Sequence, residues 1–486
     1  MAVPKGPDRP ATPLDPSGEL HGLADDCVHC GFCLPACPTY QLWGEEMDSP
    51  RGRIHLITQI LDGTEGTRAA ADHLDRCLGC MACVTACPSG VRYDRLIEAA
   101  RGWAEEPPAP FPGQPARIAP GRDTSPGGDT GPSPRTPAPL PGRPARERAM
   151  RAAIFSVFPY PRRLRMAMVP LRAAQWARLD SLLDRSGLAG RLSPELAAAL
   201  RLAPEPPPSR GRLPRRRAVR PARALPERVP AQPARRAIVG MLTGCVQQVF
   251  FPQVNAATAN VLAAEGCDVV IPAGQGCCGA LSLHGGRRTE AARFARQTIE
   301  TFERAGVDAV VVNSAGCGSA MKEYAELLAD DAGWSSRAAA LAGKVRDLSE
   351  FLVELGPAAV RHPLTVTAAY HDACHLAHAQ RITAQPRKLL TAIPGLCLTD
   401  IADGGTCCGS AGIYNLVQPE AARELGQRKA ENVAATGADL LVSGNPGCAM
   451  QIASALAARG APMPMAHIAE VLDASVRNTG PAALLA

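Results

Sequence analysis

Eight cysteines near the N-terminus follow one spacing twice. The pattern C-x2-C-x2-C-x3-C-P begins at Cys27 and begins again at Cys77. Thiolates at this spacing bind cubane iron–sulfur clusters, and in proteins with two clusters the fourth cysteine of each run binds the cluster of the other run. Zinc ribbons use two C-x2-C pairs instead, so zinc is the weaker interpretation.

The two runs therefore predict two [4Fe–4S] clusters with crossed ligand sets. The first cluster takes Cys27, Cys30, Cys33 and Cys87. The second cluster takes Cys77, Cys80, Cys83 and Cys37. Clusters of this kind transfer electrons, so the expected role of the chain is electron transfer, with no catalytic residue of its own.

Eight further cysteines form two matching sets in the C-terminal half. The first set recurs 129 to 131 residues later as the second: Cys245, Cys277, Cys278 and Cys317, then Cys374, Cys407, Cys408 and Cys448. Adjacent cysteines cannot form an unstrained disulfide with each other. The pairs therefore favour a further metal or iron–sulfur centre, and redox-active or vestigial thiols are the alternative that stays open.

Polar residues gather around the second set. They are His371, Asp372, His375 and His378, which lie beside Cys374. Imidazoles next to a metal centre tune its potential or relay protons. The alternative is that these histidines only make hydrogen bonds at the end of a strand.

The elements that carry the C-terminal cysteines repeat as well. Apolar runs at 237–243, 267–273 and 308–314 predict buried parallel strands, and the periodic run at 289–306 predicts a helix. Each repeat is thus a small α/β unit whose cysteines follow the carboxyl ends of strands, where open α/β sheets place their ligands. Cys267 and Cys397 match each other at the opposite end of a strand, and both are expected to be buried core cysteines.

Two proline-rich stretches divide the chain, because proline sustains neither a helix interior nor a central strand. The helical period at 51–63 favours an α-helical ferredoxin-type domain at the N-terminus. The expected fold class is a multidomain α+β protein. Its segments are a two-cluster domain at 20–103, a linker at 104–145, a helical segment at 146–202, an Arg- and Pro-rich linker at 203–236, and two duplicated α/β domains at 237–345 and 362–475.

Composition excludes several classes of function. The 486-residue chain has 18 cysteines but no apolar leader, which argues against a secreted disulfide scaffold. No apolar run is long enough to cross a bilayer. We expect a cytoplasmic protein, either free or peripheral on the cytoplasmic face of the inner membrane. The net charge of +6 comes from the linker at 203–236, so nucleic-acid binding is not expected.

The segment at 146–202 mixes arginines with apolar residues at helical spacing. We expect helices that pack on a neighbouring domain. The alternative is a basic amphipathic surface that contacts a partner subunit or an anionic membrane.

Together these motifs resemble the iron–sulfur subunits of glycolate oxidase (glycolate dehydrogenase). The wider group joins two ferredoxin motifs to two cysteine-rich CCG domains, and it includes subunits of heterodisulfide reductase and of anaerobic glycerol-3-phosphate dehydrogenase, and lactate-utilisation proteins. The resemblance rests on the two ferredoxin runs and on the segments at 244–247, 274–286, 370–381 and 407–415.

The resemblance implies an assembly in which FAD-binding partner subunits oxidise glycolate. This chain would carry electrons from a partner's flavin to a quinone-linked or other acceptor, and would be inactive alone. The alternative is an electron-transfer or thiol/disulfide-active subunit of a related lactate, glycerol-3-phosphate or heterodisulfide oxidoreductase. The full CCG motif ends in C-x-x-C, whereas Ala320 and Gln451 stand at its last position here, which argues against disulfide cleavage.

Overall fold

The computed structural model describes residues 14–64, 66–106, 143–177, 193–202 and 225–485. The chain divides into two compact units, residues 1–147 with 284–287 and residues 148–283 with 288–486. The proline-rich linkers expected at 104–145 and 203–236 lie largely outside the described residues, at 107–142 and 203–224.

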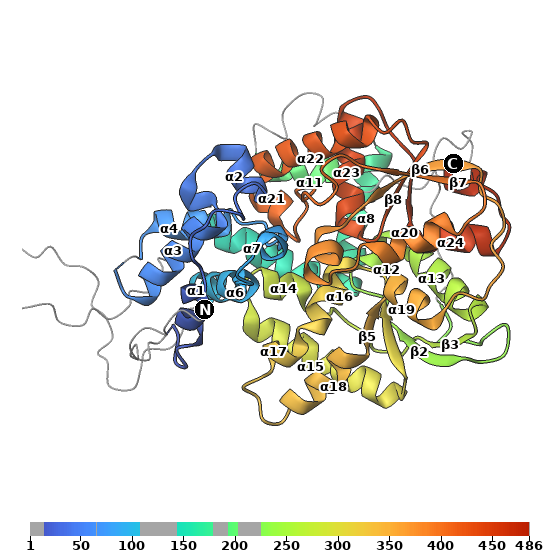
Figure 1. Ribbon diagram of the computed structural model, residues 1–486, viewed down its shortest axis with the longest axis horizontal. Helices are drawn as coiled ribbons and strands as arrows, with labels where there is room; N and C mark the ends of the chain where they lie inside the picture. The colour runs from blue at the N-terminus through green and yellow to red at the C-terminus, as the bar shows by residue number, and fades with distance from the viewer. Residues whose placement is uncertain (1–13, 65, 107–142, 178–192, 203–224, 486) are drawn as a thin grey trace, which may run out of the picture. The chain divides into compact units, whose positions relative to one another are not determined.

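The first unit, drawn in blue in Figure 1, is built from short helices in its described part. They are α1 (Glu19–Asp25), α2 (Pro38–Trp43), the 3-10 helix η1 (Glu46–Asp48), α3 (Pro50–Leu61), α4 (Arg68–Asp75), α5 (Ala82–Ala86) and α6 (Tyr93–Glu105). The core lies between α3 and α6, where Ile57, Ile60, Leu96 and Ile97 are fully buried. Ile57 and Ile60 are three residues apart and lie on one face of α3, and on α6 the buried Ala100 follows Ile97 by three residues and Leu96 by four.

Helix α3 confirms the helix expected at 51–63. Its N-cap is Ser49, whose Oγ accepts a hydrogen bond from the backbone N–H of Gly52 at 3.0 Å. Pro50 occupies the first position of the helix, where a missing N–H costs nothing. A Cβ on Gly52 would lie 2.0 Å from the carbonyl oxygen of Glu46, so only glycine allows η1 to approach α3 this closely.

The second unit begins with the helices of the expected middle segment. These are α7 (Ala145–Val157), whose first residues belong to the first unit, α8 (Pro161–Trp176) and α11 (Pro194–Leu202). Phe155 packs with Ile413, and Leu164 packs with Phe250. This confirms helices that pack on a neighbouring domain. Met166, Val169 and Trp176 of α8 are exposed.

The first α/β repeat contains a sheet of order β1-β3-β2-β4-β5. Its strands are β1 (Arg228–Val229), β2 (Ala237–Met241), β3 (Cys267–Val270), β4 (Ala309–Val312) and β5 (Val345–Asp347). All pairs are parallel except β1 with β3. The helices are α12 (Gln247–Phe250), α13 (Pro252–Ala264), α14 (Ala280–His284), α15 (Arg288–Ala305), α16 (Ala315–Lys322), α17 (Tyr324–Leu327), α18 (Ser335–Lys344) and α19 (Leu348–Leu355).

The second repeat has a parallel sheet of the same topology, β7-β6-β8-β9. Its strands are β6 (Val366–His371), β7 (Leu396–Asp400), β8 (Leu440–Ser443) and β9 (Met465–His467). The helices are the π-helix η2 (His375–Ala379), α20 (Ala384–Thr391), α21 (Tyr414–Val417), α22 (Pro419–Ala434), α23 (Pro446–Ala458), α24 (Ile468–Val476) and α25 (Ala482–Leu485). The expected α+β class, with a helical domain and two duplicated α/β domains, is confirmed.

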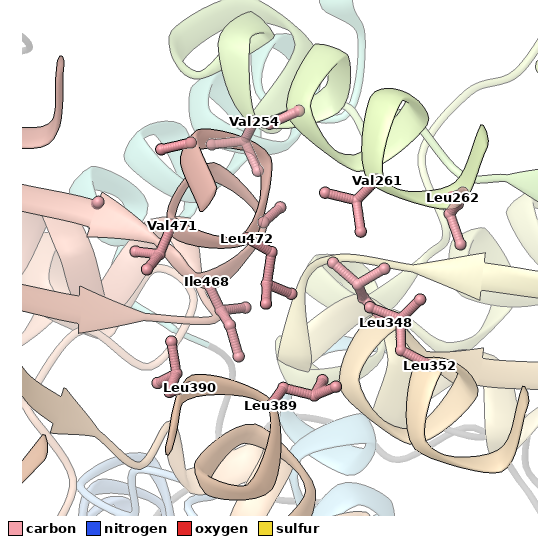
Figure 2. Packing of buried hydrophobic residues seen from close by; sticks show 14 of the residues in the cluster. Val254, Val261, Leu262, Leu348, Leu352, Leu389, Leu390, Ile468, Val471 and Leu472 are labelled. Carbon is pink, nitrogen blue, oxygen red and sulfur yellow. The ribbon is translucent and has the colours of Figure 1, made fainter. Parts of the chain in front are cut away.

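The two repeats share one apolar core. Figure 2 shows Val254, Val261 and Leu262 of α13 near Ile468, Val471 and Leu472 of α24, with side chains of α19 and α20 completing the cluster. Helix α13 of the first repeat contacts α24 of the second, and α19 of the first contacts α20 of the second. The apolar faces of α13 and α19 in the first repeat are therefore covered by α24 and α20 of the second repeat.

Cys267 and Cys397 turn out not to be equivalent. Cys267 is fully buried as expected, but Cys397 is exposed, so the prediction for Cys397 is wrong. Cys267 pairs with Ala237, whereas Val366, at the matching place in β6, pairs with Leu396. Leu396 is thus the structural counterpart of Cys267. A shift of one residue moves a side chain to the other face of a strand.

No helix in the described part of the chain combines the length and apolar character needed to span a bilayer.

In each repeat, the residue at the end of the final strand is the N-cap of the helix that follows, but the residue type differs. The Asp347 carboxylate accepts from the N–H of Ser349 at 2.7 Å at the start of α19, and His467 Nδ1 accepts from the N–H of Ala469 at 3.0 Å at the start of α24. Burial raises the pKa of Asp347 to about 6 and lowers the pKa of His467 to about 4.

We predict that Leu472→Ala lowers the free energy of unfolding of the second unit by about 2–5 kcal/mol, because it opens a cavity in the core shared by the repeats. Val360→Ala is the matched control, since Val360 is 71% exposed. Urea unfolding followed by far-UV circular dichroism measures both variants. Equal stability of the two variants would contradict a core shared in this way.

A second prediction concerns acid stability. Folding keeps His467 neutral, with a pKa of about 4 against 6.5 in a free histidine, so protons bind the unfolded chain preferentially and stability falls as pH drops from 6.5 to 4. The loss at pH 4 is on the order of 3 kcal/mol. His467→Asn keeps a side-chain acceptor for the cap and should remove this loss, as measured by unfolding midpoints across that range.

Asp347→Asn is the opposite control. The raised pKa of Asp347 means that the folded chain binds the proton more readily, so Asp347 adds stability as pH falls from 6 to 3.8. The Asn variant should lose that gain and become more acid-sensitive than the wild type. If the stability of the two variants changed with pH in the same way, the opposite roles assigned to His467 and Asp347 would be refuted.

Candidate metal centres

The two ferredoxin-type loops fold in the same way. The residue before the second cysteine and the residue after it are left-handed in both loops: His29 and Gly31 in the first, Gly79 and Met81 in the second. This conformation is costly for the non-glycine members and persists where the surrounding structure demands it. The repeated spacing thus produces one repeated turn that directs three cysteines inward.

The eight cysteines of these runs surround two hollows. The first is lined by Cys27, Cys30, Cys33 and Cys87, and Cys83 also borders it. The second is lined by Cys37, Cys77, Cys80 and Cys83. The hollows hold about 420 and 310 Å³ of space not filled by protein atoms, part of it open to solvent. Each hollow therefore brings together three cysteines of one run and the last cysteine of the other.

The donor set fits the two expected clusters. None of the eight thiols is in a disulfide, and each hollow gathers sulfur ligands from both runs. Burial raises the pKa of Cys33 to about 11 and also raises the pKa of Cys27 and of Cys83. Because thiolates are the ligands, binding must release protons from these thiols. The assignment of each cysteine to a cluster stays a prediction.

A buried network of charges supports the second hollow. Arg53 is 1% exposed, and its guanidinium donates to Thr39 Oγ1 at 3.0 Å and pairs with Asp48 at 3.3 Å. Asp48 also contacts His73 Nδ1 at 2.9 Å and Arg76 at 3.0 Å. The two guanidiniums, of Arg53 and Arg76, outnumber the Asp48 carboxylate, so this network holds net positive charge beside the hollow.

Cys77 is the thiol that the network affects most directly. Burial alone would raise its pKa, but the guanidiniums of Arg53 and Arg101 outweigh burial and lower it. Tyr93 Oη and the N–H of Gly79 also donate to Cys77 Sγ, at 3.5 and 3.3 Å. Hydrogen bonds and cations of this kind tune the reduction potential of a bound cluster.

The C-terminal cysteines form one group in each repeat. Cys245 and Cys277 Sγ lie 3.7 Å apart in the first, and Cys374 and Cys407 Sγ lie 3.9 Å apart in the second. In both repeats the first cysteine follows the first strand of the sheet, the adjacent pair follows the neighbouring strand, and the last lies in the helix after the third strand. The carboxyl ends of parallel strands meet at one edge, which explains the convergence.

The glycine after each Cys–Cys pair serves helix packing. Gly409 has φ of +88°, and a Cβ there would lie 2.6 Å from the carbonyl oxygen of Ala422 in α22. Gly279 has the same relation to Ala291 in α15, at 3.0 Å. A side chain at either position would therefore collide with helix backbone.

The surrounding polar residues divide by role. His371 is 1% exposed, and one of its ring nitrogens lies within 4.8 Å of the sulfurs of Cys408 and Cys448. Asp372 instead pairs with Arg387, at 2.7 and 2.8 Å, and His378 Nε2 contacts the carbonyl oxygen of Gly405 at 2.8 Å. Of this cluster, His371 is the imidazole that the structure brings to the thiols.

The positions that depart from C-x-x-C are filled by packing residues. Ala320 is 1% exposed. Gln451 donates to the carbonyl oxygen of Ala422 at 2.8 Å and accepts from Asn415 at 3.2 Å. Both side chains have structural partners in place of a ligand role.

Two features of the sites escaped sequence reasoning. One is the Arg53–Asp48 network, which had no signal beyond basic residues in a helical run. The other is Lys429, 2% exposed, whose Nζ donates to the carbonyl oxygens of Asp403 and Gly404 and interacts electrostatically with Cys408. An alignment of the two repeats would have drawn attention to Lys429, because the first repeat has an uncharged residue, Thr298, at the matching position.

Sequence profiles of known families match three parts of the chain. A profile described as a 4Fe-4S dicluster domain matches residues 23–91, and one described as a cysteine-rich domain matches residues 239–322 and 368–453. A third, described as the linker region of the glycolate oxidase iron-sulfur subunit, matches residues 146–203.

Curated relatives match over nearly the full chain. A probable glycolate oxidase iron-sulfur subunit of Bacillus subtilis is 36% identical over 88% of this chain and 88% of its own length. The glycolate oxidase iron-sulfur subunit of Escherichia coli is 35% identical over 90% of this chain and 91% of its own. Lactate utilization protein A of Shouchella clausii is 36% identical over 48% of this chain and 98% of its own. The first two matches, which span nearly all of each chain, show that this chain belongs to the family of glycolate oxidase iron–sulfur subunits.

Proposed function

We propose that this chain is the electron-transfer subunit of an FAD-dependent glycolate oxidase (glycolate dehydrogenase) complex. The observation that carries the proposal is the pair of hollows, each lined by three cysteines of one ferredoxin-type run and the last cysteine of the other. A 4Fe-4S dicluster profile covers the same residues. Bound clusters would supply electron transfer, the chemistry that a flavin partner needs to release its two electrons.

The residues of the chain have separate parts in this role. Cys27, Cys30, Cys33 and Cys87 would hold one cluster, and Cys77, Cys80, Cys83 and Cys37 the other. Arg53 and Arg101 place positive charge beside Cys77, which favours the thiolate and the more negative, reduced state of a cluster at that site. The two sites therefore differ electrostatically, which supports electron flow in one direction.

The partners follow from the family. We propose that FAD-binding subunits oxidise glycolate and that this chain passes the electrons to a quinone-linked or other acceptor, as a cytoplasmic protein that contacts the inner membrane peripherally. Chemistry on the hydroxy acid would remain with the partners, so the chain alone would turn over no substrate. The electron path through the ferredoxin-type runs would not require a further centre among the repeat cysteines.

Lactate is the alternative substrate of the complex. The match to lactate utilization protein A covers 48% of this chain, less than the glycolate oxidase matches. Co-purification of the chain with its partners, followed by assays with both acids, separates the two. Faster turnover of glycolate supports the proposal, and turnover of lactate alone would overturn the substrate assignment.

Cys80→Ser tests the electron-transfer role. Cys80 is 8% exposed and lines the second hollow, so its loss should remove one cluster and halve the iron content of the anaerobically purified chain. In the assembled complex, reduction of the partner's flavin by glycolate should survive in rapid-mixing measurements. Delivery of electrons to the acceptor should fall by more than an order of magnitude.

Cys397→Ser is the matched control, because Cys397 is exposed and lies outside the cysteine groups. It should leave both iron content and electron delivery unchanged. Wild-type electron delivery in the Cys80→Ser complex would mean that the clusters are structural only. Turnover of glycolate by the isolated chain would refute the division of labour between subunits.

A further inference from the structure

The second α/β repeat brings an imidazole and two thiols to one point. The ligand atoms of His371, Cys408 and Cys448 all lie within 4.8 Å of one another. All three side chains are buried, at 1%, 1% and 3% exposure. Sulfur ligands around one tetrahedral zinc ion are about 3.8 Å apart, given a Zn–S distance near 2.3 Å. The group thus has the dimensions of a site for a single ion.

His371 has no conventional partner in this position. Neither of its ring nitrogens makes a hydrogen bond to a nitrogen or oxygen atom in the described part of the chain, although the side chain is fully enclosed. Burying a polar group away from nitrogen and oxygen partners is unfavourable. The interaction recorded for its ring is with the Cys408 thiol, so the imidazole and the thiols form one closed set of ligand atoms.

The charge around the group suits an anionic centre. Lys429 is 2% exposed and interacts electrostatically with Cys407, Cys408 and Cys448. Its Nζ donates to the backbone carbonyls of Asp403 and Gly404. A divalent ion with three thiolates and one neutral imidazole carries one negative charge, which would balance the buried ammonium. Asn445 Nδ2 also donates to Cys448 Sγ, at 3.3 Å.

The first repeat lacks these additions. Leu242, at the place of His371, packs against Cys278 in an apolar cluster. Thr298, at the place of Lys429, donates to the carbonyl oxygen of Phe294. Among the residues that the structure describes, the first repeat has no three ligand atoms as close together as those of the second. The two cysteine groups therefore differ in the residues around them, although the spacing of the cysteines in the sequence is nearly the same.

We propose that the second repeat alone holds one mononuclear zinc ion, bound by His371, Cys408 and Cys448. Cys374 or Cys407, whose sulfurs lie 3.9 Å apart, would complete the site by moving closer, since neither belongs to the group of ligand atoms within 4.8 Å of one another. Mixed sulfur and nitrogen ligands in a closed tetrahedral site are typical of structural zinc. The ion joins the end of β6, the loop after β7 and helix α23. The inference does not depend on the electron-transfer role.

Metal and sulfide analysis of the full-length chain tests the proposal. The chain is reconstituted anaerobically with iron and sulfide, incubated with Zn²⁺ and desalted. We expect one zinc ion per chain besides the irons of the two clusters. His371→Leu, which introduces the residue of the first repeat, and Cys408→Ser should both lose the zinc and keep the iron. Cys278→Ser, the matched change in the first repeat, should keep both metals.

Cobalt substitution supplies a readout of the ligands themselves. Co²⁺ in place of zinc should give thiolate-to-cobalt charge-transfer absorption in the wild type and in Cys278→Ser, and none in Cys408→Ser. A folded wild-type chain without zinc would overturn the proposal, whatever the variants do. Zinc retained in His371→Leu would also overturn it. The analysis could also find more iron and sulfide than two cubane clusters contain. If Cys408→Ser removes that excess, the site binds an iron–sulfur cluster and the zinc proposal is wrong.

Discussion

Sulfur ligands can hold an inorganic centre only where the backbone brings distant thiols to one place, and both architectures of this chain satisfy that constraint. In the helical unit, two loops of the same left-handed turns each present three cysteines, and the start of the following segment carries a fourth to the other hollow. In the α/β repeats, parallel strands end at one edge of the sheet and deliver four cysteines there. The remaining helices mainly fix these convergences in place.

The surroundings of the thiols then decide what each group can do. Near Cys77, arginines and hydrogen-bond donors favour a negatively charged centre. In the second repeat an imidazole and a buried ammonium stand where the first repeat has leucine and threonine. A duplicated spacing of cysteines therefore does not imply a duplicated site, because the residues that supply charge and further ligands are not part of the spacing.

Much of the fold could be predicted because it depends on local patterns. The strands at 237–243, 267–273 and 308–314 and the helices at 51–63 and 289–306 are set by hydrophobic period, and the convergence of cysteines follows from strand polarity. The exposure of Cys397 could not be predicted, since a register shift of one residue leaves no trace in composition. The environment of Arg53 and Lys429 depends on packing between segments far apart in sequence, which no local pattern contains.

The core shared by the repeats has a consequence for how the chain is made. Helices α13 and α19 are finished by residue 355, but α24, which covers α13, ends only at residue 476. At translation rates of about 5–20 residues per second, the gap lasts roughly 6–24 s. During that interval the nascent first repeat exposes Val261, Leu262 and Leu352 to water and to other chains. Synthesis of this protein therefore includes a period in which that apolar surface lacks the cover that α24 later supplies.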